Sequence, residues 1–298
     1  MLVAILVLLW RATDGQEALR LLLSADIGWL AAAALALTIQ TVLSAQRWRL
    51  TARQLGIVIQ PFEAVREYYL SQVINQSLPG GMIGDAGRAV RARAQAGLLM
   101  SSQAVMYERL AGQLGLVAVL VAALPLTLVL PAGFEWPVWL IAPVVGLLVI
   151  VLALPIGIVF ALRLLGPGDH VLRRVVRTMI LALAARNVRA RQVTLSLGTA
   201  LCNLAAFAFC AAALGVTLPM LAVATLVPLI LFAMLVPITI SGWGVREGAA
   251  TLLLPLTGTA ASEAFATSVA FGLIFILAVL PGFAFIWLRP NAHVIEQR

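Results

Sequence analysis

The chain has 298 residues, of which 62% are hydrophobic and 11% are charged. Soluble domains carry about 25% charged residues, so this composition excludes a soluble enzyme and predicts an integral membrane protein. All 20 basic residues are arginines, against 12 acids, which gives a net charge of +8. Without lysine, a Schiff-base or P-loop mechanism is excluded. Because the arginines adjoin apolar runs, anionic lipid is a more economical partner than nucleic acid, which we do not expect.

Five apolar runs predict transmembrane helices, because about 20 apolar residues cross a hydrocarbon core. They cover residues 27–45, 110–131, 138–162, 193–214 and 264–288. After the first run, we expect Trp48 at the membrane interface, with Arg47 and Arg49 outside the span. Residues 1–10 are apolar but too short to cross alone. We predict an all-α polytopic protein with about six to eight transmembrane helices.

The arginines are concentrated in two stretches. Residues 47–109 hold eight of them and residues 163–191 hold seven, so the positive-inside rule places both stretches in the cytoplasm. Within the second stretch, Arg173, Arg174 and Arg177 alternate with apolar residues at helical spacing. This pattern predicts an amphipathic helix lying on the inner leaflet.

A polar stripe interrupts residues 68–84. Tyr68, Gln72, Asn75, Gln76 and Pro79 share one helix face by their spacing, which is typical of the wall of a wet cavity inside protein. Pro79 and three glycines then break the helix: Gly80, Gly81 and Gly84. We predict a re-entrant segment over residues 61–90.

A second break follows the apolar run at 220–240. It contains Ser241, Gly242 and Gly244, and the apolar stretch after it, 249–261, is too short for a full crossing. We predict a second re-entrant segment over residues 220–258. Paired breaks in two halves indicate an inverted-repeat transporter; the alternative is two interfacial glycine-rich turns.

These segments divide one transmembrane domain, residues 1–298, into three parts. The first half covers 27–130, a connecting span and cytoplasmic helix cover 138–192, and the second half covers 193–288.

Three arginines beside these motifs each lie within three residues of an acid. An intramembrane arginine costs about 2.5–3.5 kcal/mol, so it persists mainly beside water, a counter-charge or an anionic ligand. Guanidinium groups bind phosphate through two N–H groups; the alternative is buried salt bridges that fix helix packing. The residues with which we expect substrate to interact are Arg88, Arg109, Arg246, Asp85, Glu108, Glu247, Gln72, Asn75, Gln76, Gly80, Gly81, Gly84, Ser241, Gly242 and Gly244. The two cysteines and two histidines form no recognisable metal or haem motif, and we expect neither metal nor cofactor.

Three motifs resemble the lysylphosphatidylglycerol synthase transmembrane (flippase-like) family. Residues 78–88, 108–112 and 237–248 follow its patterns LPGG-x-GGD-x-x-R, ER-x-x-G and P-x-S-x-x-G-x-GVREG, in order, within residues 27–288. Met82-Ile83 departs from the usual Ile-Gly. Since ten residues follow Leu288, the resemblance implies the flippase half alone, without lipid aminoacylation.

The resemblance implies a non-enzymatic protein that moves or binds an anionic phospholipid or polyprenyl-phosphate-linked lipid between the leaflets of the bacterial cytoplasmic membrane. The alternative is a membrane-embedded transferase, or an accessory subunit, that acts on a polyprenyl-phosphate or glycolipid substrate. An ion channel is disfavoured because no selectivity-filter sequence is present. Such a role allows a homo-oligomer and lipid- or glycan-synthesis enzymes as protein partners.

Overall fold

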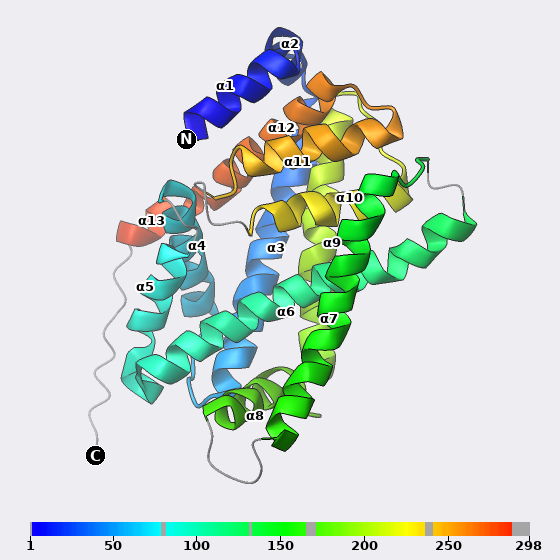
Figure 1. Cartoon of the computed structure of the whole chain (residues 1–298). Coiled ribbons are helices and arrows are strands. Elements are labelled where there is room, and N and C mark those ends of the chain that lie inside the picture. The colour runs from blue at the N-terminus through cyan, green and yellow to red at the C-terminus, as the bar shows by residue number, and fades with distance from the viewer. Residues whose placement is uncertain (1, 79–81, 131–132, 165–170, 236–240, 288–298) are drawn as a thin grey trace, which may run out of the picture.

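A computed structural model describes residues 2–78, 82–130, 133–164, 171–235 and 241–287. Within these ranges the chain forms helices and no strands (Figure 1). The helices are α1 Leu2–Ala12, α2 Gly15–Leu23, α3 Ile27–Gln54, α4 Pro61–Ser77, α5 Ile83–Arg91, α6 Arg93–Val129, α7 Val138–Leu164, α8 Val171–Leu183, α9 Arg189–Ala213, α10 Met220–Ala233, α11 Val245–Leu253, the short 3-10 helix η1 Leu254–Thr257, α12 Ala261–Val279 and α13 Pro281–Trp287.

Several of these helices can cross a membrane by length and composition. In the described part of the chain they are α3, α6, α9 and Ala261–Phe285, which runs through α12 into α13. Helix α7, which bends by 40°, makes a fifth. The predicted all-α polytopic membrane protein is therefore confirmed, although six to eight spans is more than these criteria support.

Helix α3 corrects the predicted end of the first span. It continues to Gln54, nine residues beyond the predicted boundary, and Arg47 and Trp48 are only 4% and 2% exposed. Their predicted position at and beyond the membrane interface stays a prediction, but both side chains are covered by protein. The physical reason for this burial is a polar helix face that packs against neighbouring helices, formed by Gln40, Thr41, Ser44, Arg47 and Thr51.

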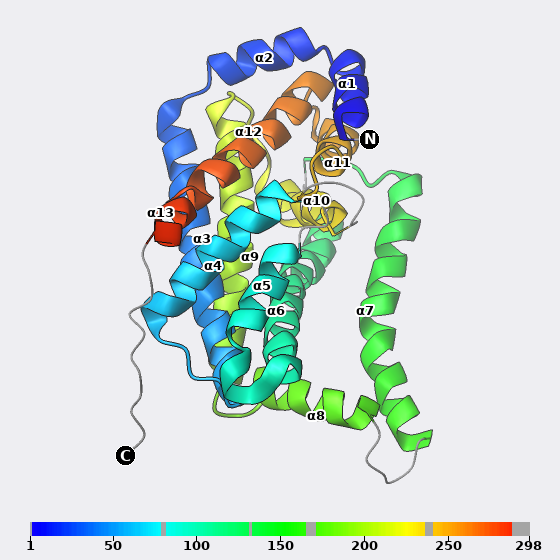
Figure 2. The same ribbon diagram turned by 90° about the vertical axis from the view of Figure 1, so that its left-hand side faces the viewer.

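Two helical hairpins occupy the predicted broken segments. Helices α4 and α5 form the first, and α10 and α11 the second (Figures 1 and 2). Helix α10 ends at Ala233, within the apolar run at 220–240. Residues 79–81 and 236–240, between the paired helices, lie outside the described ranges. A Cβ on Gly84 would lie 2.0 Å from the Ser71 carbonyl oxygen, so only glycine permits this approach of α5 to α4.

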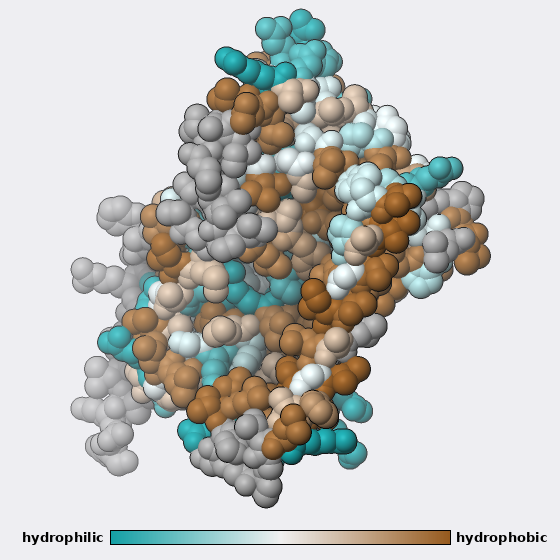
Figure 3. Space-filling model, in the orientation of Figure 1, coloured by the Kyte–Doolittle hydropathy of each residue, from teal (hydrophilic) through white to brown (hydrophobic). Residues whose placement is uncertain are grey.

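Parts of both arginine-rich stretches lie at one end of the molecule (Figure 2). Helix α8 lies across this end, near the end of α3 and the start of α6, whereas α1 and α2 lie at the opposite end (Figure 2). The predicted helix between residues 163 and 191 is confirmed as α8. Tyr107 of α6 fixes it by donating a hydrogen bond to the Val175 carbonyl at 3.0 Å. Apolar side chains cover much of the visible surface, with hydrophilic ones at both ends and in a patch at mid-height (Figure 3).

The buried apolar residues form two clusters. The larger joins α3, α9, α10 and α12 around Leu37, Phe207, Leu226 and Phe271. The smaller surrounds Trp48 and includes residues of α3, α5 and α6. Polar and charged side chains collect where these clusters meet.

Candidate functional site

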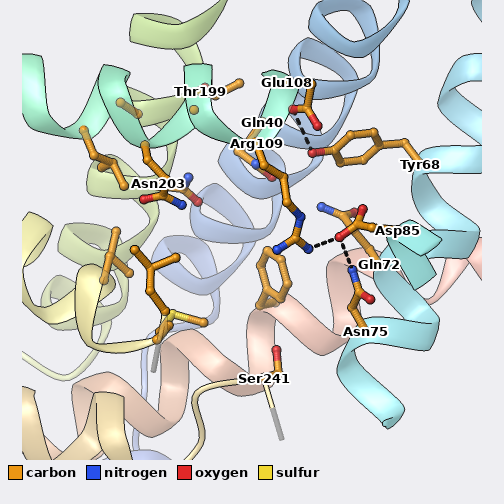
Figure 4. Close-up of a pocket in the computed structure, with 18 of the residues that line it drawn as sticks. Gln40, Tyr68, Gln72, Asn75, Asp85, Glu108, Arg109, Thr199, Asn203 and Ser241 are labelled. Atoms are coloured by element: carbon orange, nitrogen blue, oxygen red, sulfur yellow. Dashed lines mark hydrogen bonds and ion pairs between the residues drawn. The ribbon is translucent and has the colours of Figure 1, made fainter. Parts of the chain in front are cut away.

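A cavity of about 250 Å³ lies inside the helical bundle. This is far more than the roughly 10–15 Å³ that one water requires. Figure 4 shows polar side chains from several helices converging on it. Its lining comprises Gln40, Arg47, Tyr68, Gln72, Asn75, Gln76, Asp85, Glu108, Arg109, Gly112, Gln113, Leu116, Thr199, Ala200, Asn203, Leu231, Met234, Leu235, Ser241, Phe271 and Phe275.

Glu108 of α6 is the centre of a buried ionic network. Its side chain has no exposed surface. Its Oε1 accepts from Arg47 Nε at 3.1 Å, Arg47 Nη2 at 2.6 Å and Tyr68 Oη at 3.3 Å. Its Oε2 accepts from Arg88 Nη2 at 2.8 Å. A carboxylate offers about four lone-pair positions, so Glu108 is saturated by three neighbouring helices.

Asp85, in the first turn of α5, is saturated in the same way. Its Oδ1 accepts from Ser71 Oγ at 3.0 Å and from Arg88 Nε at 2.8 Å. Its Oδ2 accepts from Asn75 Nδ2 at 3.1 Å and forms an ion pair with Arg109 Nη2. Asn75 in turn accepts a hydrogen bond from the Gly84 backbone N–H at 2.8 Å. The two helices of the first hairpin are thereby locked together.

Arg88 lies behind this lining and does not reach the cavity. Its side chain is buried, and its guanidinium carbon lies 4.9 Å from the Trp48 ring centroid and 4.6 Å from that of Tyr68. Both distances are within the range of cation–π attraction. Arg88 therefore positions Asp85 and Glu108, and a ligand in the cavity would not contact it directly.

Arg47 and Arg109 are the two arginines that line the cavity. The Arg109 side chain is 36% exposed and extends across the cavity toward Asp85 (Figure 4). Arg47 Nη1 donates to Thr199 Oγ1 at 2.6 Å. A Cβ on Gly112 would lie 2.7 Å from Arg47 Nη2, so this glycine makes room for the guanidinium.

The second hairpin holds its own buried arginine. Arg246 forms an ion pair with Glu247, donates to Ser268 Oγ at 3.0 Å, and has the Trp243 and Phe271 ring centroids at 5.0 and 5.4 Å. Glu247 also accepts from the Gly244 backbone N–H.

The turn before α11 has left-handed backbone at three positions. The φ angles are 50° at Ser241, 78° at Gly242 and 85° at Gly244. Glycine adopts this region without the Cβ penalty. Among the proposed substrate-contacting residues of this hairpin, only Ser241 lines the cavity, whereas Arg246 and Glu247 are buried against α12.

The expected pairs of arginine and acid are found in two of three cases. Arg88 pairs with Asp85, and Arg246 with Glu247. Arg109 instead forms an ion pair with Asp85, and the Glu108 carboxylate is held by Arg47, Tyr68 and Arg88. Gly80 and Gly81 lie outside the described residues.

Sequence reasoning missed five polar residues of the lining: Gln40, Arg47, Gln113, Thr199 and Asn203. The helical spacing of Gln40, Ser44 and Arg47 is the signal that could have found the α3 wall.

The described residues contain no group of three or more histidine, cysteine or acidic side chains that could hold a metal ion. The fold and the site define a multi-pass helical membrane protein with a partly open cavity between its helices, whose polar lining includes guanidinium and carboxamide groups. The chain matches the Lysylphosphatidylglycerol synthase TM region family over residues 1–282 and belongs to it. Neither the curated proteins nor the solved structures gave a significant match.

Proposed function

We propose that this protein binds the phosphate of an anionic lipid in its central cavity and moves that lipid between leaflets of the bacterial cytoplasmic membrane, without catalysing a reaction. Its family membership supports a role in lipid handling. The observation that carries the proposal is a cavity among candidate membrane-spanning helices that is lined by Arg47 and by the partly exposed Arg109. Paired guanidinium groups suit a phosphodiester, which accepts several charge-assisted hydrogen bonds.

The two hairpins support transport through this cavity. We infer that the two hairpins re-enter the membrane, one from each face. Inverted-repeat transporters have this arrangement, and their broken helices meet near the midplane. The first hairpin contributes Tyr68, Gln72, Asn75 and Gln76, and Ser241 precedes the second helix of the other hairpin. The acyl chains would remain in lipid while the headgroup occupies the polar space.

The saturation of Asp85 and Glu108 favours transport over the transferase alternative. A transferase acting here would need a carboxylate able to take a proton or a metal. Both acids already accept about four hydrogen bonds or ion pairs. Formation of a new lipid product by the purified protein would support the transferase instead.

Lipid movement can be measured with purified protein in proteoliposomes containing a fluorescent phosphatidylglycerol, with dithionite to quench the outer leaflet. Arg109→Lys keeps the charge but removes the two-pronged donor. Losing one hydrogen bond to a charged group costs about 1.5–3 kcal/mol, so we expect transport to fall roughly 10- to 100-fold. Arg53→Lys, on the exposed part of α3, is the matched control.

Normal transport by Arg109→Lys at normal yield would contradict the phosphate contact. A fall in yield that parallels the fall in transport would instead assign Arg109 to helix packing.

A further inference from the structure

Six carboxamide side chains line the cavity, from helices α3, α4, α6 and α9: Gln40, Gln72, Asn75, Gln76, Gln113 and Asn203. Gln76, Gln113 and Asn203 make no side-chain hydrogen bond to another described residue, and the Gln76 Oε1 atom is buried. Asn203 lies across the cavity from Asp85 (Figure 4). Neutral donors and acceptors therefore remain available to a bound molecule on more than one side.

The cavity offers little to an ammonium group. Asp85 and Glu108 have their lone-pair positions taken by arginines, Tyr68, Ser71 and Asn75. Two of the three aromatic rings in the lining already hold a cation, because Tyr68 packs on the Arg88 guanidinium and Phe271 on that of Arg246; the third is Phe275. An amine would lose its hydration without gaining a counter-charge.

The charges around the cavity sum to one positive charge. Arg47, Arg88 and Arg109 form one network with Asp85 and Glu108. A single phosphodiester, with one negative charge, neutralises this network. A phosphomonoester, with about −1.5 to −2, would leave an uncompensated charge in the bilayer.

We propose that the lipid accepted here carries an uncharged polyol or sugar headgroup attached through one phosphodiester, and no amine. A hydroxyl both donates and accepts hydrogen bonds, as a carboxamide group does, so Gln76, Gln113 and Asn203 can each bind one. The phosphate would lie beside Arg47 and Arg109, with the hydroxyl groups toward the carboxamides. This inference rests on the proposed function for the lipid nature of the ligand.

The test compares four fluorescent lipids with identical acyl chains in proteoliposomes of the full chain. Phosphatidylglycerol and phosphatidylinositol carry hydroxyl headgroups, phosphatidylethanolamine an amine, and phosphatidylserine an amine at the same net charge of −1. Each hydrogen bond contributes about 0.5–1.5 kcal/mol, which corresponds to roughly two- to tenfold. We expect the two hydroxyl lipids to move at least roughly fivefold faster than phosphatidylserine.

Two variants assign this selectivity to the carboxamides. Asn203→Leu and Gln113→Met keep side-chain size but remove the hydrogen-bonding groups, and each should reduce movement of the hydroxyl lipids roughly two- to tenfold. Movement of phosphatidylserine should stay at its low rate. Gln103→Met is the control, because Gln103 lies ten residues earlier on α6 and outside the cavity.

A second measurement tests binding of the headgroup independently of transport. The thermal stability of the detergent-solubilised protein is followed with short-chain forms of the same lipids. If no lipid moves but phosphatidylglycerol stabilises the protein more than phosphatidylserine does, the proposed transport fails and the headgroup class stands. If phosphatidylserine moves or stabilises as well as phosphatidylglycerol, or if the carboxamide variants behave like Gln103→Met, the headgroup inference is overturned.

Discussion

Replacing Glu108 by Gln should destabilise the protein strongly. The side chain is fully buried and accepts hydrogen bonds from Arg47, Arg88 and Tyr68. The variant removes the shared counter-charge of two buried guanidinium groups and raises the net charge of the network from one to two. Removing one partner of a buried ion pair costs about 3–5 kcal/mol, which is the expected loss in free energy of unfolding.

The assay is SDS-induced unfolding in mixed micelles, followed by circular dichroism. Glu63→Gln is the control, because Glu63 is exposed on α4 and its neutralisation should change stability by less than about 0.5 kcal/mol. The double variant Arg47→Gln, Glu108→Gln restores a net charge of one. It should recover part of the loss, with a coupling free energy of about 0.5–3 kcal/mol. Equal stability of Glu108→Gln and Glu63→Gln would refute the account of the network.

Two further changes test the packing of the first hairpin and the role of α8. Gly84→Ala should lower yield and thermal stability, because its Cβ would lie 2.0 Å from the Ser71 carbonyl oxygen; a normal melting temperature would contradict this close contact. Neutralising three arginines of α8, Arg173, Arg174 and Arg177, should weaken association with anionic lipid vesicles in flotation assays by about 1 kcal/mol per charge. Glu63→Gln should have no such effect. Complete loss of transport with unchanged vesicle association would point to a gating role for α8.

The spans could be predicted from the sequence because hydropathy over about 20 residues reflects the bilayer itself. The pairing of Arg88 with Asp85 was also accessible, since residues three apart share a helix face. Local spacing could not reveal that Glu108 pairs with Arg47, 61 residues earlier. That contact depends on how α3 packs against α6, which hydropathy does not encode.

Arg47 shows most clearly why part of the site was missed. The sequence Gln46-Arg47-Trp48-Arg49 has the composition of a membrane interface, and the same residue types also suit a buried ionic network. A membrane interface and a buried network differ here only in whether other helices cover that end of α3. The polar spacing from Gln40 to Arg47 is a sign of such coverage, and the prediction did not use it.

The ion pairs hold one group of helices together more rigidly than the helix on the other side of the cavity. Helices α3, α4, α5 and α6 are joined through Glu108 and Asp85, so separating them would leave charges unpaired in a low-dielectric interior. Helix α10 and the residue after it face the cavity through Leu231 and Met234, whose dispersion contacts have no preferred direction. Sliding along such a surface exchanges one set of weak contacts for another. If the protein moves lipid as proposed, a gate for the headgroup would cost least on the α10 side, with helices α3, α4, α5 and α6 as the fixed frame.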